Sequence, residues 1–352
     1  MMVQSIQLQH FRSYKNDSFE FGPSVNIIVG PNAIGKTNLL EAILVIARGS
    51  SYRVRDAELI EFDQPWARVD ASVDGYQRTI KLVNGPKLEK TYELAGRAYK
   101  RLNFDDSLPV VMFEPNHLIL LTGSPEGRRE YLDTLLVQTT VSYNTSLRSF
   151  QRTLAQRNRL LKDARVNSEQ LFPWNVRLSK LGGIVARGRV QLVDSINQKI
   201  GQLYKDLAHS KIKVSIEYNC SFNPEEYESH MLQQLEKRVH EDITLGFTSF
   251  GPHREDFSVI FDGHRAEKTA SRGETRTFVV ALKLIELELL KEMRNKTPFL
   301  LLDDVFSDLD GARRRALTLR LQPYQTFITT TDADIILEHF NEQSNVVLIS
   351  KT

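Results

Sequence analysis

The sequence predicts an α/β protein whose core is split into two lobes by a long, mainly helical insertion. Three observations lead to this prediction. Residues 25–44 read as an apolar strand, a glycine-containing loop and a helix, and residues 299–304 read as an apolar strand that ends in two aspartates. Helical periodicity fills much of the chain between them. A strand, loop and helix together with an acidic strand make up one phosphate-binding core. Because residues 25–44 and 299–304 supply these parts, the two halves of the core lie far apart in sequence.

The loop carries the most specific signal. In a strand–loop–helix of this kind, successive backbone N–H groups surround phosphates and the helix points its positive end at them. The lysine reaches the outer phosphates and the following threonine can ligate Mg²⁺. The alternative is an ordinary glycine-containing turn before a helix. We therefore predict that a nucleoside triphosphate and Mg²⁺ bind at Gly30, Pro31, Asn32, Ala33, Ile34, Gly35, Lys36, Thr37 and Asn38.

The acidic strand is the expected partner of the loop, because Mg²⁺ bound to phosphates needs a carboxylate at the end of a neighbouring strand. Asp303 is predicted to lie near Mg²⁺, and Asp304 to polarise an attacking water. We therefore assign Lys36 and Asp304 as the catalytic candidates, and Thr37 and Asp303 as the metal ligands. The alternative for the aspartates is an acidic turn after a buried strand.

Composition indicates a globular protein of ordinary hydrophobicity. Hydrophobic residues make up 41% of the 352 residues, and the net charge is +2. No apolar run approaches the ~20 residues that span a bilayer, and the N-terminus lacks the pattern of a secretory signal. The single cysteine, Cys220, excludes an internal disulfide. We expect a cytoplasmic protein.

Periodicity changes along the chain. Alternation predicts strands at 66–73 and 76–83 around an Asp-Gly turn, and a buried strand at 110–113. Spacings of three and four residues predict helices from about Gly127, with a break near Phe172-Pro173. Alternation then returns at 212–218 and 257–261. The expected domains are an N-terminal ATPase lobe at 1–126, a helical arm at 127–240 and a C-terminal ATPase lobe at 241–352.

The predicted arm is basic. Residues 141–190 contain ten lysines and arginines and two acids, a net +8, which leaves −6 for the rest of the chain. A basic segment on a mildly acidic body can bind phosphate backbones, although a solvated helix face explains the same charges. The candidate DNA contacts are Arg148, Arg152, Arg157 and Arg159.

A second helix start precedes the acidic strand. Ser271 and Glu274 have the spacing of a capping box, which explains both without a ligand. The same start, with Gly273, is also suited to an anion, because free N–H groups and the positive helix end lie there. An acidic segment with Asp308 and Asp310 follows the aspartate strand.

These elements, in this order, resemble the heads of ABC-type, Rad50- and SMC-like ATPases, in which two heads enclose two ATP molecules. More specifically, the chain resembles the RecF family of bacterial recombination mediators. The resemblance covers nearly the whole length. It is carried by His10–Tyr14, Gly123–Pro125, Arg128–Asp133, Gln156–Lys162, Trp174, Gly251–Arg254 and Ala270–Thr277.

The resemblance implies a weak, DNA-stimulated ATPase that forms a homodimer with ATP on double-stranded DNA, gapped DNA or strand junctions included. It also implies action with RecR and RecO to load RecA at gaps. By the same resemblance, Arg12 approaches the nucleotide. The residues expected to contact ATP held by the other subunit are Ser271, Gly273, Glu274, Asp308 and Asp310.

Two positions depart from the related heads. Asp304 stands where transporter heads have a glutamate, which is consistent with slow turnover, and Thr331 or Asp332 stands where many heads have a histidine. No glutamine can be assigned as the metal-sensing residue of the N-terminal lobe. Two other functions stay open: a nucleotide-gated scaffold that does not hydrolyse ATP, and an ATPase subunit of a transporter, although no membrane segment is visible.

Overall fold

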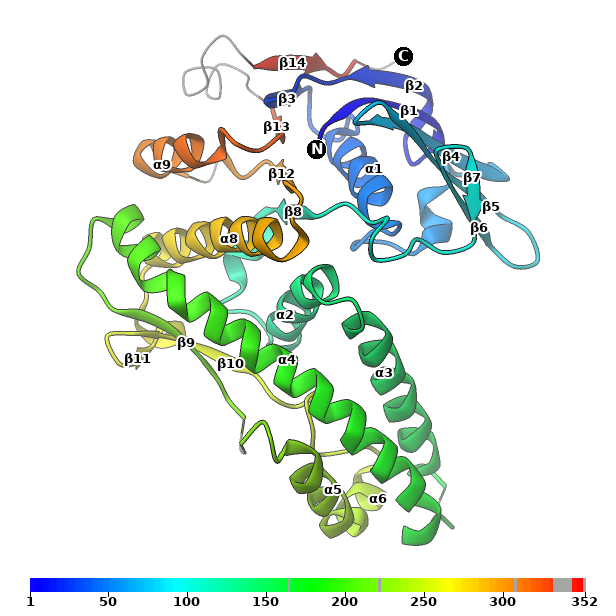
Figure 1. The fold of residues 1–352 in the computed structure, drawn as a ribbon, viewed down its shortest axis with the longest axis vertical. Coiled ribbons are helices and arrows are strands. Elements are labelled where there is room, and N and C mark those ends of the chain that lie inside the picture. The colour runs from blue at the N-terminus through cyan, green and yellow to red at the C-terminus, as the bar shows by residue number, and fades with distance from the viewer. Residues whose placement is uncertain (164, 221–222, 307–308, 332–343, 351–352) are drawn as a thin grey trace. The chain divides into compact units, whose positions relative to one another are not determined.

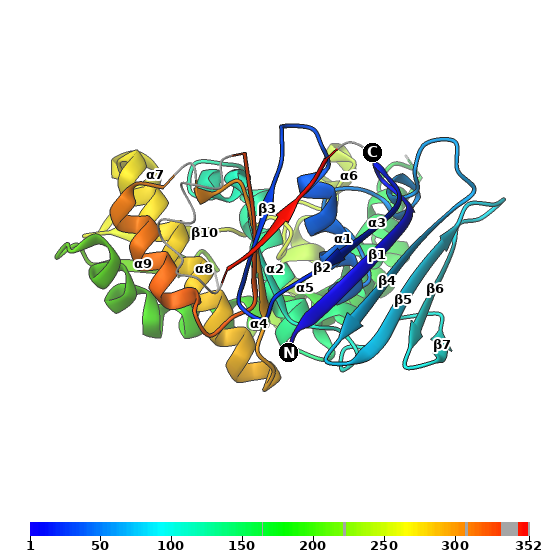
Figure 2. The ribbon, with the colours of Figure 1, turned by 90° about the horizontal axis from the view of Figure 1, so that it is seen from above.

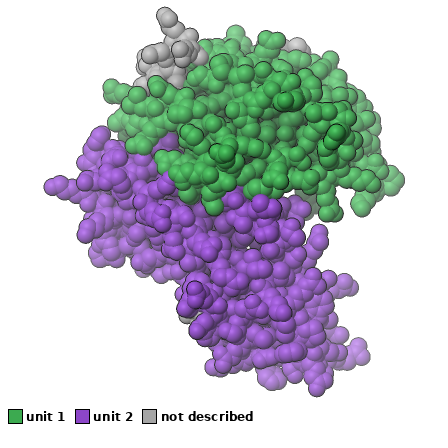
Figure 3. All heavy atoms as spheres, viewed as in Figure 1, with its two compact units in different colours: residues 1–118, 286–352 green, residues 119–285 purple. Residues whose placement is uncertain are grey.

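The computed structural model describes residues 1–163, 165–220, 223–306, 309–331 and 344–350. The chain forms two compact units, coloured separately in Figure 3. Unit 1 contains Met1–Leu118 and Glu286–Thr352, and unit 2 contains Ile119–Ile285. Unit 1 therefore joins the N-terminal and C-terminal parts of the chain into one core. The large sequence separation between the phosphate loop and the acidic strand predicts this arrangement.

A five-stranded parallel sheet forms the centre of unit 1. Its order is β14-β3-β13-β12-β8. The middle strands β13 and β12 are buried at every residue, as expected for a parallel sheet covered on both faces. The strands are β3 (Val25–Val29), β8 (Val110–Phe113), β12 (Phe299–Asp303), β13 (Thr326–Thr330) and β14 (Asn345–Leu348).

A six-stranded antiparallel sheet completes unit 1, in the order β2-β1-β4-β5-β6-β7. The expected hairpin at 66–83 is confirmed, with Asp74 and Gly75 both at positive φ in its turn. Helix α1 (Lys36–Arg48) packs against strands of both sheets and lies between them (Figure 2). The strands are β1 (Val3–Phe11), β2 (Tyr14–Glu20), β4 (Trp66–Val73), β5 (Tyr76–Val83), β6 (Glu89–Leu94) and β7 (Arg97–Tyr99).

The remaining elements of unit 1 are short helices and one long helix that it shares with unit 2. Helix α8 begins in unit 2 and ends in unit 1. The bounds are η1 (Asp56–Leu59), η2 (Pro115–Ile119), α8 (Arg272–Arg294) and α9 (Gly311–Leu321).

Unit 2 is mainly helical, with a small antiparallel sheet in the order β11-β10-β9. Asn197 of α4 satisfies the free edge of β9, because its side chain bonds both the N–H and the carbonyl of Ile216. The helices are α2 (Pro125–Thr139), α3 (Tyr143–Leu160), α4 (Ser168–Ala208), α5 (Tyr227–Lys237), α6 (Val239–Leu245) and α7 (Ala266–Thr269). The strands are β9 (Val214–Tyr218), β10 (Phe257–Phe261) and β11 (His264–Arg265).

Two expectations for this region differ from the structure. Helix α4 runs through Pro173 without the expected break. Its start is held by a capping box, in which Asn167 and Gln170 exchange side-chain bonds to backbone N–H groups. The second boundary between the compact units lies after residue 285 rather than residue 240, because β10 pairs with β9 and keeps the following segment in unit 2.

No helix among the described residues is long and apolar enough to cross a membrane.

Candidate nucleotide site

The phosphate-binding loop joins the end of β3 to the start of α1. Two of its residues have positive φ, Ala33 at 62° and Gly35 at 117°. Gly35 needs this freedom also because a Cβ there would lie 2.8 Å from Ser13 Oγ. A Cβ at Gly30 would lie 2.9 Å from the carbonyl oxygen of Ile349. The glycines therefore permit a tight curl of backbone at the N-terminus of α1, where an anion is stabilised.

Lys36 folds back over this curl. Its Nζ donates hydrogen bonds to the carbonyl oxygens of Gly30 at 2.7 Å and Pro31 at 2.9 Å. The side chain is 8% exposed. Burial lowers the pKa of the Lys36 ammonium, while the nearby carboxylates of Asp304 and Asp303 act in the opposite direction. The Lys36 ammonium therefore lies inside the loop. Phosphate oxygens of a bound nucleotide would replace the carbonyls of Gly30 and Pro31 as its hydrogen-bond partners.

The loop and the acidic strand meet through Thr37 and Asp303. The Thr37 hydroxyl lies 2.9 Å from both carboxylate oxygens of Asp303, although the two residues are 266 positions apart. Asp303 also accepts a hydrogen bond of 2.7 Å from the Thr329 hydroxyl on β13. Parallel register places these groups together, since Asp303 of β12 pairs with Thr329. The predicted pairing of loop and acidic strand is therefore present.

These groups suit Mg²⁺. The Thr37 hydroxyl and the Asp303 carboxylate are hard oxygen ligands, and Mg²⁺ typically takes one or two protein oxygens together with waters and substrate phosphates. In the described part of the chain, no group of three or more histidine, cysteine, aspartate or glutamate side chains could hold a metal ion by itself.

Asp304 follows the strand in a left-handed conformation, with φ at 52°. Aspartate tolerates this region better than most residues. Its backbone N–H donates to the Thr329 hydroxyl at 3.0 Å, and the residue is exposed. The turn therefore separates the two aspartates. Asp303 contacts the hydroxyls of Thr37 and Thr329, whereas Asp304 is exposed at the carboxyl end of the strands.

A third carboxylate, Glu114, lies at the same edge and was missed from the sequence. Strand β8 runs parallel to β12, and Phe113 pairs with Leu302, so Glu114 leaves the sheet where Asp303 ends its strand. Glu114 accepts a 2.5 Å hydrogen bond from the Tyr52 hydroxyl. Burial and this bond raise the pKa of Tyr52, which remains the donor. The signal that could have located Glu114 is its position directly after the buried strand at 110–113.

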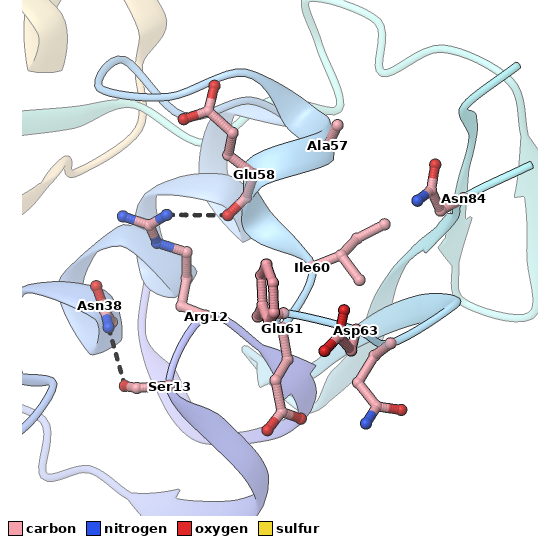
Figure 4. A pocket seen from close by; sticks show the side chains of 11 residues that line it. Arg12, Ser13, Asn38, Ala57, Glu58, Ile60, Glu61, Asp63 and Asn84 are labelled. Atoms are coloured by element: carbon pink, nitrogen blue, oxygen red, sulfur yellow. Dashed lines mark hydrogen bonds between the residues drawn. The ribbon is translucent and has the colours of Figure 1, made fainter.

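The turn between β1 and β2 borders the loop from the other side. Tyr14 donates to the carbonyl of Gly35 at 3.0 Å, and Asn38 donates to the Ser13 hydroxyl at 2.9 Å. Arg12 donates to the carbonyl of Glu58 at 2.9 Å. Arg12, Ser13, Asn38 and Glu58 line a pocket of about 720 Å³, shown in Figure 4, whose wall also includes Phe62, which is 87% exposed. Asn38, in the first turn of α1, places one wall of this pocket beside the phosphate loop.

The predicted trans contacts have local explanations in this single chain. Ser271 and Glu274 form the expected capping box, with bonds of 2.7 and 3.2 Å at the start of α8. Asp310 caps α9 through a 2.9 Å bond from the N–H of Arg313. Gly273 is part of the α8 start. Asp308 and Asp332 lie outside the described residues, and Thr331 is exposed just after β13.

The arm requires one correction. Arg157, a predicted DNA contact, is completely buried. Its guanidinium forms an ion pair of 2.7 Å with Asp242 and bonds of 2.8 Å with Asn175 and Thr248. Arg189 is also buried, in a 2.8 Å ion pair with Asp133. By contrast, Arg148, Arg152 and Arg159 are exposed on α3, which packs along α4 (Figure 1).

Comparison with known proteins agrees with this geometry. The family model for the RecF/RecN/SMC N terminal domain matches residues 2–351. Two solved SMC heads, one bound to the C-winged helix domain of ScpA, are similar at TM-scores of 0.55 and 0.51 and at 15% and 16% identity, which supports the fold alone. The fold and site thus define an ABC-type ATPase head.

Closer relatives identify the family within this class. A DNA replication and repair protein RecF from Heliobacterium modesticaldum is 35% identical over 344 residues, covering 94% of this chain and 92% of the relative. One from Clostridium perfringens is 31% identical over 361 residues, covering 98% and 97%. The recombination mediator protein RecF-ATP of the RecFOR pathway has a solved structure with a TM-score of 0.84 and 30% identity, over 94% of this chain and 92% of that one. The chain belongs to the RecF family of DNA replication and repair proteins.

Proposed function

We propose that this protein is an ATP-driven, DNA-binding clamp of recombinational repair, with slow ATP hydrolysis that DNA stimulates. The observation that carries the proposal is the contact between Thr37 and Asp303, at 2.9 Å, which brings the phosphate loop and the acidic strand into one site. The ATP-bound relative supports ATP as the ligand. The pocket beside Arg12 and Asn38 is a suitable place for the nucleoside.

The residues divide the work as follows. Lys36 leaves the carbonyls of Gly30 and Pro31 and binds the outer phosphates, while the N–H groups of the loop hold the β- and γ-phosphates. Mg²⁺, held by Thr37 and Asp303, would neutralise phosphate charge. Asp304 orients the attacking water from the open edge of the sheet. An aspartate reaches less far than a glutamate, which favours slow turnover.

ATP is proposed to close two subunits around two nucleotides. The partner's α8 start would then meet the γ-phosphate through Ser271, Gly273 and Glu274, with Asp308 and Asp310 nearby. The exposure of Ser271 supports this role, as does its position at the N-terminus of a 23-residue helix. Because the capping box already uses both side chains, the ligand would be bound mainly by the helix N–H groups and by the Ser271 hydroxyl.

We expect Ser271→Arg to bind ATP as the wild type does but to lose dimer-dependent turnover, because a long cation would block the approach of the partner's nucleotide. The ATPase rate per subunit is measured over a range of protein concentrations. In the wild type it should rise with concentration, and in the variant it should stay flat. Ser271→Thr keeps the hydroxyl and serves as the control. A variant whose rate rises like that of the wild type would contradict the trans role.

Double-stranded DNA is proposed to lie along α3. Arg148, Arg152 and Arg159 are separated by four and seven residues, so their side chains fall within about 40° around the helix axis and span roughly 16 Å. An exposed stripe of this kind can follow a phosphate backbone and would bind without reading sequence. Arg157 takes no part, since its charge is already neutralised inside unit 2.

Neutralising two members of this stripe should weaken the salt dependence of DNA binding. In Arg148→Gln/Arg152→Gln, the slope of log affinity against log salt is expected to fall by about 2, roughly 1 for each lost phosphate contact. Fluorescence anisotropy with duplex DNA at several salt concentrations measures it. Lys100→Gln/Arg101→Gln removes the same charge from exposed positions in unit 1 and is the matched control. Equal slopes in both variants would contradict the α3 interface.

The RecFOR pathway that is named for the solved relative supports a further part of the proposal. We assign this protein a role with RecR and RecO in loading RecA at gapped DNA, with release of the clamp by hydrolysis.

A further inference from the structure

Helix α1 carries a buried carboxylate that the proposed chemistry leaves unused. Glu41 is 2% exposed and lies among fully buried apolar residues such as Leu40, Ala42 and Ile43. A charge in such surroundings is costly unless it is paired. Glu41 is four residues after Thr37, so the helix presents both side chains on one face. The face that meets the metal ligand Asp303 therefore also presents Glu41, one turn further from the loop.

Two segments attach to this carboxylate, one at each oxygen. Arg12, from the β1–β2 turn, places its Nε 3.0 Å from Glu41 Oε2. Ser51, from the loop after α1, donates a 2.5 Å hydrogen bond to Glu41 Oε1. The Ser51 hydroxyl also accepts bonds from the N–H groups of Arg53 and Val54, at 3.0 and 3.3 Å. Glu41 thereby contacts both the turn at 51–54 and the Arg12 side chain, which also donates to the carbonyl of Glu58.

Each segment places an arginine at a different end of the proposed nucleotide site: Arg12 at the pocket and Arg53 beside Asp303. Arg12 lines the pocket beside Asn38. Arg53 lies at the metal end, with its Nη1 3.8 Å from Asp303 Oδ2. The two arginines come from segments about 40 residues apart, and among the described contacts Glu41 is the side chain that both segments share.

We infer that Glu41 is a positioning residue that sets nucleotide affinity through Arg12 and ATP preference through the Ser51–Arg53 turn. This inference rests on the proposed function, because it takes the pocket and the Asp303 edge to be the two ends of one ATP site. Arg12 contributes equally to the affinities for ATP and ADP, because it borders the part of the site that both nucleotides occupy. The Arg53 side favours ATP, because it lies where the metal and the terminal phosphate bind.

Two substitutions, one at Glu41 and one at its partner Ser51, separate these effects. Glu41→Gln loses the ion pair with Arg12 but keeps an acceptor for Ser51, so the Kd for ATP and for ADP should rise together, by about tenfold. Ser51→Ala should lower the preference for ATP over ADP and leave ADP affinity unchanged. Binding is measured by calorimetry with each nucleotide and Mg²⁺. Glu41→Gln is close in shape to the wild type, and Ser51 lies on a loop, so both variants should fold.

A double-mutant cycle tests positioning against a merely structural role. If Glu41 acts through Arg12, then Arg12→Gln and Glu41→Gln should each weaken ATP binding, and the double variant should be no weaker than either. Glu286→Gln is the matched control. It removes a carboxylate that is also buried, 3% exposed, and whose charge acts on Arg48 at the far end of α1. It should leave both Kd values unchanged.

The outcomes distinguish this inference from the proposed function. Wild-type protein that fails to bind ATP would overturn the proposed function itself. If the wild type binds ATP, then wild-type affinity in Glu41→Gln, or additive losses in the double variant, would overturn the positioning role alone. A loss in Glu286→Gln equal to that in Glu41→Gln would show a general effect of buried carboxylates and would also overturn it.

Discussion

Replacing Lys36 by methionine is expected to weaken ATP binding severely and to abolish turnover while the fold is retained. Methionine fills the buried space of the side chain but cannot bond phosphate oxygens or the carbonyls of Gly30 and Pro31. Losing one partner of a desolvated charge pair costs about 2–5 kcal/mol, which corresponds to an affinity roughly 30-fold to more than 1,000-fold weaker. Calorimetric titration with Mg²⁺-ATP measures the loss, and thermal unfolding checks the fold.

Lys296→Met provides the control. Lys296 is exposed in the same unit and bonds the carbonyl of Asp105 at 2.8 Å, so the same substitution there should leave ATP binding unchanged. ATP affinity near the wild-type value in Lys36→Met would remove the phosphate loop from the nucleotide site, and with it the rest of the proposed chemistry.

The second large effect concerns the arm. Arg157→Met is expected to lower the free energy of unfolding by about 3–5 kcal/mol, because it leaves the carboxylate of Asp242 buried without its counter-charge. Asp242 and Arg157 are both completely buried, with 2.7 Å between Nη1 and Oδ2. Urea unfolding measures the change. Replacing both partners, as in Arg157→Met/Asp242→Leu, should recover much of the loss, since no charge then remains unpaired.

Arg159→Met is the control that separates the effect of losing a buried arginine from the effect of losing a positive charge. Arg159 is two residues further along α3 and exposed, so its replacement should change the free energy of unfolding by less than about 0.5 kcal/mol. Equal stability of the Arg157 and Arg159 variants would mean that the buried ion pair contributes nothing to the stability of unit 2.

The nucleotide core could be predicted from sequence because its signals are local. The glycine-containing loop, the strand before it and the helix after it are contiguous, and their conformations depend on neighbouring residues. The hairpin at 66–83 is similar, since Asp74 and Gly75 adopt the positive φ values that their residue types favour. The strand at 299–303 is recognisable from its apolar run, and its proximity to Thr37 follows from the chemistry that the two share.

The errors and omissions concern contacts between segments that are distant in the chain. Arg157 looks like a surface cation in α3, and its partner Asp242 is 85 positions away. Glu114 becomes part of the site only because β8 pairs beside β12. Glu41 looks like an ordinary helix glutamate until Arg12 and Ser51 are brought to it. Net charge over a window cannot separate exposed arginines from buried ones, so the +8 segment overstates the charge that is available to DNA.

The start of α4 shows a different limit. Proline usually marks a helix boundary, but Pro173 is the sixth residue of α4, and the capping box at Asn167 starts the helix before it. Likewise, residues 241–285 belong with unit 2 because of strand pairing with β9, which no local pattern shows.

The central claim is that ATP closes two chains into a dimer. Light scattering in the presence of Mg²⁺-ATP or Mg²⁺-ADP tests it most directly, with wild type and with Asp304→Asn, which we expect to slow hydrolysis. We expect the 40.4 kDa chain to be a monomer with ADP and a dimer with ATP, and the dimer to persist longer in the variant. A monomer under all of these conditions would contradict the two-chain sandwich and the trans role of Ser271.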